Sequence, residues 1–417
     1  MPPVHDLVIR GGTLYDGSGA PPARGDVAVA SDRIAAVGAV QARGARELDA
    51  AGLAVAPGFI NMLSWATDTL FADGRSQSDI RQGVTLEVFG EGWSLGPLNE
   101  RMKRERTEQQ GDIKYHITWT TLDEALETLV ARGISTNIAS FVGATTLRMH
   151  EIASDDRPPS ADELGRMRAL VDRAMRDGAL GVGSSLIYAP AAYATTDELV
   201  ALCEAAAPYG GMYISHLRSE GGRLLEAIDE LIEIARRARV GAEIYHLKQA
   251  GRSNWPKLDG AIQRVESARR EGLAITADMY PYEAGATGLD ACFPPWAHDG
   301  GPEALRARLR DATARAHPGG DVASGVLVGE SLRGGRGTRG YPARVLQERA
   351  AQAAHREDAR RDRGRARRRS ARRRDGPRRG GREPRRHDRV HGIAGEPAAR
   401  GRAAVDELRV RRGLDRA

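Results

Sequence analysis

Two hydrophobic patterns divide the chain. Up to about residue 56, apolar and polar residues alternate with a period of two, as in Asp6-Leu-Val-Ile-Arg and Asp26-Val-Ala-Val-Ala. This alternation is typical of half-buried β-strands. A turn at Ser31-Asp32 leads into a third such run, and a fourth begins at Leu53. The first part of the chain therefore predicts a small antiparallel β module.

From Gly83 onward, short apolar runs alternate with amphipathic segments, which is the pattern of βα units around a parallel sheet. The expected strands are 83–90, 135–142, 179–186, 211–216, 241–247 and 273–280, and the expected helices are 122–132, 160–177, 196–207, 222–238 and 258–271. Capping boxes are expected at Ser160…Glu163 and Thr195…Glu198. From 135 onward, strand starts recur every 30 to 45 residues, so the pattern favours a barrel over a sandwich. The charged segment 99–121 predicts a long loop over the barrel mouth.

The last part of the chain has a different composition. The net charge is +6, but residues 356–417 hold 23 arginines and 10 acidic residues, so residues 1–355 carry a net charge of −7. The apolar pattern fades after about Gly319, and a segment so rich in arginine cannot bury a core. We therefore expect a β module at 1–56, an incomplete barrel at 57–330 and an Arg-rich tail at 331–417.

Cysteine usage and hydropathy limit the cellular setting. Cys203 and Cys292 are far apart and form no CxxC pair, so neither a disulfide framework nor a cysteine zinc site is supported. No apolar run approaches the roughly 18 residues of a membrane span, and the first residues lack a leader pattern. We expect a cytoplasmic protein without a membrane partner. Nucleic-acid binding by the tail, including Arg378-Arg-Gly-Gly-Arg, rests on charge alone and is the lesser alternative.

Two histidines each end an apolar strand. His216 and His246 are 30 residues apart with one amphipathic helix between them, which is the length of one βα repeat. Their imidazoles should therefore emerge side by side at the carboxyl ends of adjacent strands. Neutral imidazoles that converge on one point are natural zinc ligands, although a single histidine could equally be a hydrogen-bonded core residue. Arg218 and Glu220, which follow His216, could form an ion pair.

A third metal ligand is expected from an earlier strand. Glu91 ends strand 83–90 between glycines that allow close backbone approach, and its carboxylate can bind a metal; the alternative is an exposed loop acid. Lys248 lies two residues beyond His246, where its ammonium could hold a substrate carboxylate or be solvated. Tyr282 could reach the barrel mouth or pack in the core.

Seven motifs between about residues 5 and 300 support a specific family. They are Asp6-Leu-Val-Ile-Arg-Gly-Gly-Thr-Leu-Tyr-Asp-Gly-Ser-Gly, Ala56-Pro-Gly-Phe-Ile, Gly83-Val-Thr, Ser94-Leu-Gly-Pro-Leu, His216-Leu-Arg-Ser-Glu, His246-Leu-Lys-Gln-Ala-Gly and Tyr280-Pro-Tyr-Glu-Ala-Gly-Ala-Thr. In this order they resemble the N-acyl-D-amino-acid deacylases of the amidohydrolase superfamily. The resemblance implies an α/β fold with a (β/α)8-type, TIM-like barrel and a small β-sandwich accessory domain made from both chain ends. It also implies that His216 and His246 bind metal, and that Lys248, Tyr282 and Tyr188 lie near the substrate carboxylate.

The first departure from the family pattern concerns the metal count. After Pro-Gly-Phe-Ile the family reads Asp-x-His-x-His, whereas this chain reads Asn61-Met-Leu63-Ser-Trp65. Leu63 and Trp65 cannot ligate a metal, so we expect one zinc ion per chain, bound by the two histidines and Glu91. The bridging cysteine of the family, in Gly-Asn-Cys-Gly, corresponds here to a segment one residue shorter that contains Glu91. Leu63 and Trp65 are expected to fill the space of the missing metal pair by apolar packing.

The second departure is the absence of the Gly-Ser-Asp motif, whose aspartate is the general base of the family. No catalytic residue is therefore assigned to this chain. Back-translating residues 401–417 with chosen, permitted codons and reading one base later gives Val-Ala-Leu-Pro-Trp-Met-Ser-Phe-Gly-Ser-Asp-Ala-Gly-Ser-Ile-Ala, which contains Gly-Ser-Asp. The tail is thus interpreted as an out-of-frame reading, and we expect the 417-residue chain to be inactive and poorly folded after about residue 320.

The resemblance implies an amide hydrolase. One zinc ion would lower the pKa of a bound water toward about 7 and polarise the substrate carbonyl, while an aspartate would transfer the proton in an intact relative. The expected substrate is an N-acyl-D-amino acid or a related small molecule with a carboxylate. A D-amino-acid dipeptidase, a hydantoinase-like cyclic amidase and an inactive frameshifted pseudoenzyme remain alternatives. The acyl group, the stereochemistry and the oligomeric state are left open.

Overall fold

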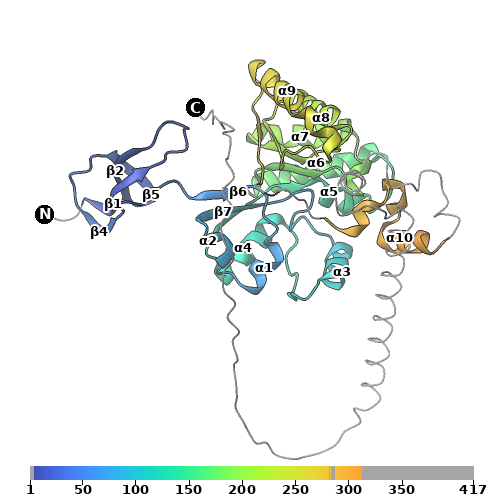
Figure 1. Ribbon diagram of the computed structural model, residues 1–417. Coiled ribbons are helices and arrows are strands. Elements are labelled where there is room, and N and C mark those ends of the chain that lie inside the picture. The colour runs from blue at the N-terminus through green and yellow to red at the C-terminus, as the bar shows by residue number, and fades with distance from the viewer. Residues whose placement is uncertain (1–3, 281, 283–286, 312–417) are drawn as a thin grey trace, which may run out of the picture. The chain divides into compact units, whose positions relative to one another are not determined.

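The structure is a computed structural model that describes residues 4–280, 282 and 287–311 (Figure 1). The described residues fall into two compact units that divide between Gly58 and Phe59. Each unit has its own sheet system and its own hydrophobic core. The tail predicted at 331–417 lies outside the described residues.

The first unit is a single five-stranded sheet. Its strands are β1 (His5–Leu14), β2 (Ala23–Ala30), β3 (Arg33–Gly38), β4 (Gly44–Asp49) and β5 (Ala54–Val55). The pairs β1–β2 and β2–β3 are antiparallel as predicted, but β4 and β5 pair with β1 in parallel. The prediction of a purely antiparallel module is therefore wrong, because the chain crosses over after β3 and returns along the other edge of β1. Val8, Ala28 and Val40 form its small core.

All strand pairs of the second unit are parallel within the described residues. Its strands are β6 (Phe59–Asn61), β7 (Val84–Phe89), β8 (Asn137–Ser140), β9 (Val142–Gly143), β10 (Gly181–Ser185), β11 (Met212–His216), β12 (Ala242–Ile244) and β13 (Ile275–Ala277). They form the orders β6-β7-β8 and β9-β10-β11-β12-β13. Only Phe141 separates β8 from β9, and its N–H donates a 2.9 Å hydrogen bond to the Phe89 carbonyl. The predicted α/β class with parallel strands is confirmed.

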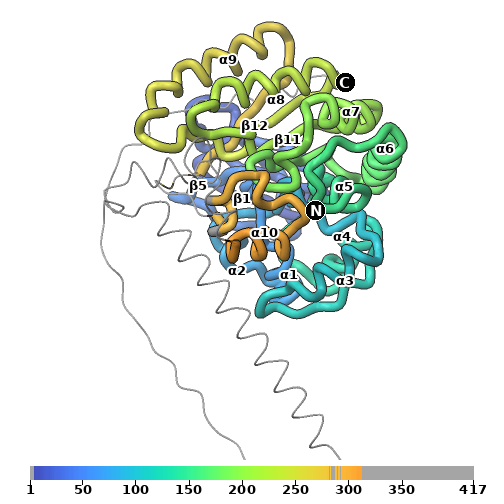
Figure 2. The backbone as a smooth tube through the Cα atoms, turned by 90° about the vertical axis from the view of Figure 1, so that its right-hand side faces the viewer, coloured from blue at the N-terminus to red at the C-terminus, as the bar shows by residue number. Residues whose placement is uncertain are grey.

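Helices connect these strands. They are α1 (Thr67–Ala72), α2 (Gln77–Ile80), α3 (Glu100–Gln109), α4 (Leu122–Arg132), α5 (Ala144–Glu151), α6 (Ala161–Arg176), α7 (Thr196–Ala206), α8 (Leu224–Ala238), α9 (Leu258–Arg270) and α10 (Gly301–Arg310), with 3-10 turns η1 (Ala191–Tyr193), η2 (Ala207–Tyr209), η3 (Arg252–Lys257), η4 (Leu289–Cys292) and η5 (Pro295–His298). In Figure 2, α6, α7, α8 and α9 lie in a row outside β11 and β12, and consecutive helices of this row pack together. Every predicted strand and helix of this part has an observed counterpart. No helix of the described residues is long and apolar enough to cross a membrane.

Two local predictions need correction. The segment 99–121 contains α3, which begins where the Asn99 side chain accepts a hydrogen bond from the Met102 N–H, so it is not only a loop. Met102 alone is buried on this helix, and one buried residue leaves little apolar periodicity to detect. At Thr195 the hydroxyl does accept a hydrogen bond from the Glu198 N–H, but the reciprocal half of the capping box is missing, because the Glu198 carboxylate binds Arg148 instead.

The strands carry side chains alternately into two cores. Val88, Phe141, Ile214 and Tyr245 form one cluster, while the neighbouring residues Phe89 and Tyr213 belong to the larger core that includes the helices. This alternation is the period-two geometry of a strand. His216 is two residues beyond Ile214 on β11, so it leaves the strand on the same side as Ile214. The alternation thereby places His216 on the side of the sheet that faces away from the helices, while Glu91 and His246 lie beyond the ends of their strands.

Candidate metal centre

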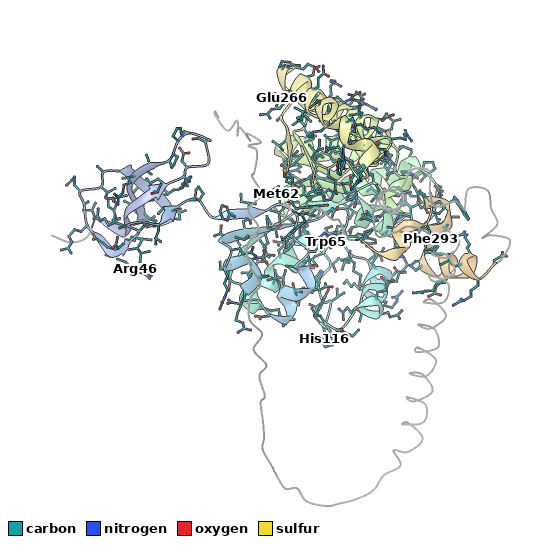
Figure 3. All side chains as sticks on the ribbon, in the orientation of Figure 1. Arg46, Met62, Trp65, His116, Glu266 and Phe293 are labelled. Atoms are coloured by element: carbon teal, nitrogen blue, oxygen red, sulfur yellow. The ribbon has the colours of Figure 1, made fainter. Side chains whose placement is uncertain are left out.

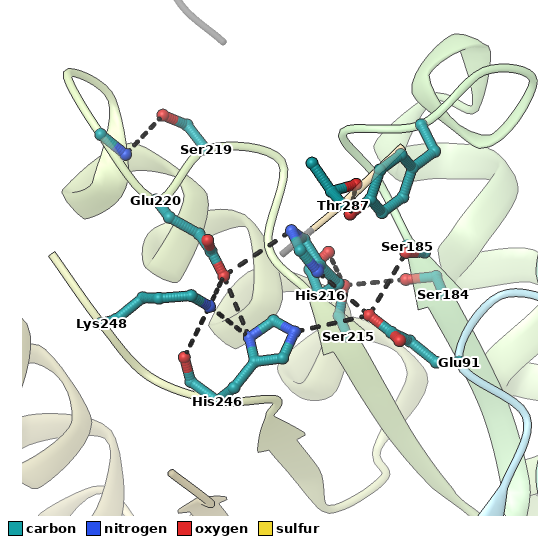
Figure 4. Close-up of polar contacts among 12 residues, drawn as sticks. Glu91, Ser184, Ser185, Ser215, His216, Ser219, Glu220, His246, Lys248 and Thr287 are labelled. Atoms are coloured by element: carbon teal, nitrogen blue, oxygen red, sulfur yellow. Dashed lines mark hydrogen bonds and ion pairs between the residues drawn. The ribbon is translucent and has the colours of Figure 1, made fainter. Parts of the chain in front are cut away.

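Three strand ends bring together the side chains that the sequence analysis expected to converge (Figure 4). Glu91 lies just beyond β7, His216 is the last residue of β11, and His246 follows β12. All three are buried. One ligand atom from each of the three lies within 4.8 Å of the other two. The predicted convergence is therefore observed, while the roles of these residues as metal ligands remain a prediction.

The Glu91 carboxylate is the hub of this cluster. Its Oε1 is 3.0 Å from His216 Nδ1 and 3.4 Å from His246 Nε2. The two imidazole rings meet edge to face, with their centroids 4.5 Å apart. Zn–N and Zn–O bonds of about 2.0–2.1 Å in a tetrahedral site place ligand atoms roughly 3.3 Å from one another. The two contacts of Oε1 have this spacing, and two imidazoles with one carboxylate are a suitable donor set for zinc, so the residues present fit the ion.

Glycines on both sides of Glu91 fix its backbone. Gly90 has a φ of +107°, and a Cβ there would lie 2.4 Å from the Phe141 carbonyl oxygen. Gly92 has a φ of +70°, and a Cβ there would lie 2.8 Å from Ser185 Cβ. Any larger residue would meet both a steric and a conformational penalty at these positions. The turn that carries Glu91 into the site therefore depends on the flanking glycines, as their pattern in the sequence suggested.

Glu220 is the site residue that the sequence analysis missed. It does not pair with Arg218, whose guanidinium instead binds Glu230 at 2.9 Å. The Oε1 of Glu220 lies 3.0 Å from His246 Nδ1, 2.5 Å from Lys248 Nζ and 3.6 Å from His216 Nε2. The signal available in the sequence is its position four residues after His216. The loop beyond β11 turns the carboxylate back to the strand end, where it is only 2 % exposed.

The buried charges shift one another's pKa values. Burial raises the pKa of Glu91, but hydrogen bonds with His216 and His246 outweigh it and lower the pKa to about 2. Burial lowers the pKa of His246, while hydrogen bonds with Glu220 and Glu91 raise it, for a net value of about 9. Without a cation His246 is therefore protonated near neutral pH, and a metal ion that binds its Nε2 must displace a proton. Metal binding here should release protons.

The three predicted substrate residues differ in their surroundings. Lys248 Nζ is occupied by Glu220, donates to the His246 carbonyl at 3.0 Å, and lies 5.3 Å from the Tyr280 ring centroid. The Tyr188 ring lies edge to face with His216 at 5.3 Å, which places it beside the centre. Tyr282 is 75 % exposed and is stacked at a tilt against Tyr280, 6.1 Å between ring centroids. The structure therefore places Lys248 and Tyr188 at the centre and Tyr282 on the surface beyond Tyr280.

The two residues that stand in place of the first histidine pair, Leu63 and Trp65, differ in their burial. Leu63 is partly buried against the cluster of Val88 and Tyr245, as the prediction of apolar packing requires. That prediction is wrong for Trp65, which is 63 % exposed. The indole Nε1–H of Trp65 donates a 3.1 Å hydrogen bond to Glu91 Oε2. An indole has one polar hydrogen that needs an acceptor, and the nearby carboxylate provides one.

The comparisons with known proteins agree with the motifs. No protein-family model matches this chain. It is 35 % identical over 289 residues to a D-aminoacylase of Alcaligenes xylosoxydans xylosoxydans, covering 68 % of this chain and 59 % of the relative. It is 33 % identical over 291 residues to an N-acyl-D-aspartate deacylase of the same organism, covering 69 % and 58 %. The chain belongs to the D-aminoacylase family. It spans about three fifths of the length of these relatives.

Solved structures of this family have the same fold over the matched part. A crystal structure of D-aminoacylase, described as defining a novel subset of amidohydrolases, superposes with a TM-score of 0.61 at 34 % identity and covers 68 % of this chain and 60 % of that one. An N-acyl-D-glutamate deacylase from Bordetella bronchiseptica, complexed with zinc and a phosphonate inhibitor, has a TM-score of 0.59 at 29 % identity and covers 67 % and 59 %. Members of the D-aminoacylase family thus share the parallel βα arrangement that carries the candidate centre.

Proposed function

We propose that this chain is built as a one-zinc amidohydrolase that removes the acyl group from N-acyl-D-amino acids. The observation that carries the proposal is the convergence of Glu91, His216 and His246 at three strand ends. The names of the relatives supply the substrate class, and the zinc in a solved relative supports the metal. In this proposal the second unit is an incomplete (β/α)8-type barrel over 57–330, and residues 1–56 belong to a β-sandwich accessory domain. The expected partner is a small carboxylate-bearing substrate in the cytoplasm.

In this mechanism the residues of the chain hold the ion and the substrate. A zinc ion held by the two histidines and Glu91 would polarise the carbonyl of the substrate and lower the pKa of a bound water. Glu220 accepts a hydrogen bond from His246 Nδ1–H, which leaves Nε2 free to ligate. Lys248 and Tyr188 would receive the substrate carboxylate, and the ammonium of Lys248 has to turn partly away from Glu220 to do so. No general base is assigned among the described residues, consistent with the proposal that the tail at 331–417 is an out-of-frame reading.

The test compares two products of the gene. We would measure zinc content and release of free D-amino acid from N-acyl-D-amino acids for the 417-residue chain and for a chain whose tail is restored to the other frame. We expect one zinc ion in both chains and turnover only in the second. His216→Ala should remove zinc from both. Turnover by the 417-residue chain would contradict the frame interpretation, and absence of zinc from both chains would contradict the metal centre.

A further inference from the structure

The two oxygens of Glu91 have different partners. Oε1 faces His216 Nδ1 at 3.0 Å and His246 Nε2 at 3.4 Å, and the Ser185 hydroxyl donates to it at 3.4 Å. Oε2 instead accepts the 3.1 Å hydrogen bond from the indole of Trp65. Trp65, labelled in Figure 3, comes from the segment after β6, which enters the centre from a different strand than either histidine. The carboxylate is thus divided between a metal-facing oxygen and a capped oxygen.

The capped side of Glu91 offers nothing to a second cation. An indole N–H is a donor without a lone pair, so it occupies Oε2 and cannot itself ligate. Leu63, two residues earlier, is packed on the apolar cluster of Val88 and has no ligand atom. A cation beside Oε2 would have to displace the indole. Its ligand there would then be Glu91 Oε2, and neither Leu63 nor Trp65 would add a second one.

The opposite side of the centre is closed by a positive charge. Lys248 Nζ lies 2.5 Å from Glu220 Oε1 and 2.8 Å from His246 Nδ1. The carboxylate of Glu220 is the ligand that a second ion would need on that side, and the ammonium already neutralises it. Among the described residues, Glu91, His216 and His246 form one cluster of three side chains able to hold an ion together.

We propose that Trp65 is a positioning residue that caps Glu91 Oε2, holds Glu91 as a one-oxygen ligand and, together with Lys248 on the other side, limits the centre to a single metal ion. This inference rests on the proposed function, because it assumes that the centre binds a metal. Fixing the rotation of the carboxylate before the ion arrives should raise metal affinity, since supporting hydrogen bonds of this kind typically contribute 10–100-fold.

Trp65 can be changed without opening the core, because its ring is 63 % exposed. Trp65→Phe keeps an aromatic ring and removes the N–H. Trp65→His replaces the donor-only indole with an imidazole that can offer a lone pair beside Oε2. Trp255→Phe is the matched control, since Trp255 is 61 % exposed on η3 and its ring lies under Arg252.

The experiment is a calorimetric titration of the metal-stripped 417-residue chain with Zn²⁺, repeated with Co²⁺ and followed by visible absorption. We expect one ion for the wild type and Trp255→Phe, one ion bound about 10–100-fold more weakly by Trp65→Phe, and a second, weaker ion in Trp65→His. Circular dichroism checks that each variant is folded, and Trp65→Leu, which also lacks a donor, replaces Trp65→Phe if that variant unfolds.

Three results would overturn the inference and leave the proposed metal centre in place. The first two are two ions in the wild type, and one ion bound with unchanged affinity after loss of the indole N–H. A Trp65→His variant that still binds a single ion would also count against the role of Trp65 in limiting the number of ions. Absence of any bound ion in every variant would overturn the proposed metal centre, and this result is distinguishable from the others.

Discussion

Two clusters of charged side chains are buried in the second unit, and they differ in their capacity to bind a proton or a metal ion. Arg148 on α5 and Glu198 on α7 form a 2.6 Å ion pair with side chains 0 % and 2 % exposed. Arg148 also donates to the Arg157 carbonyl at 2.9 Å, so this pair is a closed structural link between two helices and a loop. The metal centre is also largely buried, although the Lys248 side chain is 23 % exposed, and it joins two carboxylates to two imidazoles and an ammonium. Its charge balance therefore changes with each proton or ion that binds.

This contrast shows that burial of charge does not by itself mark function. A buried ion pair is a common structural feature, and breaking one usually costs stability rather than activity. Both clusters hold buried polar atoms without a hydrogen-bond partner: His216 Nε2 and Glu220 Oε2 in the metal centre, and Arg148 Nε and Glu198 Oε1 in the structural pair. What separates the candidate metal centre is that Glu91, His216 and His246 are side chains able to hold an ion together and lie at or just beyond the carboxyl ends of parallel strands.

The largest expected effect comes from breaking the structural pair. Arg148→Met leaves the Glu198 carboxylate buried without its cation, so the free energy of unfolding should fall by about 3–5 kcal/mol. Urea denaturation measures this loss, and zinc affinity should stay unchanged in the folded variant. The double variant Arg148→Met, Glu198→Leu should recover part of the loss, because it removes both charges. A loss of zinc affinity equal to that of a ligand variant would show that the two clusters are one unit.

The next effect comes from the acid that the sequence analysis missed. Glu220→Gln keeps the size of the side chain but weakens the acceptor for His246 Nδ1–H, so zinc affinity should fall about 10–100-fold. Chelator competition measures this affinity. The control is Glu230→Gln, because Glu230 binds Arg218 rather than the centre. Equal losses in the two variants would mean that Glu220 acts through the general stability of the loop.

Particular residues show how far the sequence could lead. The positions of His216 and His246 followed from strand periodicity and the length of one βα repeat, and the glycines around Glu91 indicated a close turn. The contacts of Glu220 and Arg218 could not be predicted, because they depend on how the irregular loop after β11 folds back. Trp65 was predicted to fill the space of the missing metal pair by apolar packing, whereas its ring is 63 % exposed and its N–H donates to Glu91, a contact that a pattern of apolar residues does not indicate.

A partly buried acid on β12, outside both clusters, provides a test of how pH changes the stability of the second unit. Glu243 on β12 accepts a 2.7 Å hydrogen bond from the Thr276 hydroxyl, and burial raises its pKa to about 7 from the ordinary 4.5. Because the folded pKa is the higher one, the folded state binds the extra proton between these values. Stability from this group is therefore present below about pH 4.5 and is lost as the pH rises toward 7.

Glu243→Gln removes this titration. We expect the variant to gain on the order of 1–2 kcal/mol of unfolding free energy relative to the wild type between pH 5 and pH 8, after allowing for solvent screening. Urea denaturation at the two pH values in the presence of chelator measures the difference without a contribution from metal. Glu233→Gln, on an exposed face of α8, is the control. Parallel pH profiles for the wild type and Glu243→Gln would contradict the assignment.

The smallest expected effect separates the helix cap from the ion pair that share Glu198. The Thr195 hydroxyl accepts from the Glu198 N–H at 3.2 Å, while the Glu198 carboxylate is held by Arg148. Thr195→Ala removes only the cap, so it should cost about 1 kcal/mol of unfolding free energy in urea, and Thr195→Ser should restore most of it. If the first turn of α7 instead forms one coupled unit with the buried pair, Thr195→Ala will release the Glu198 carboxylate and cost as much as Arg148→Met. The ratio of the two losses therefore measures how rigidly the helix start holds Glu198 in place.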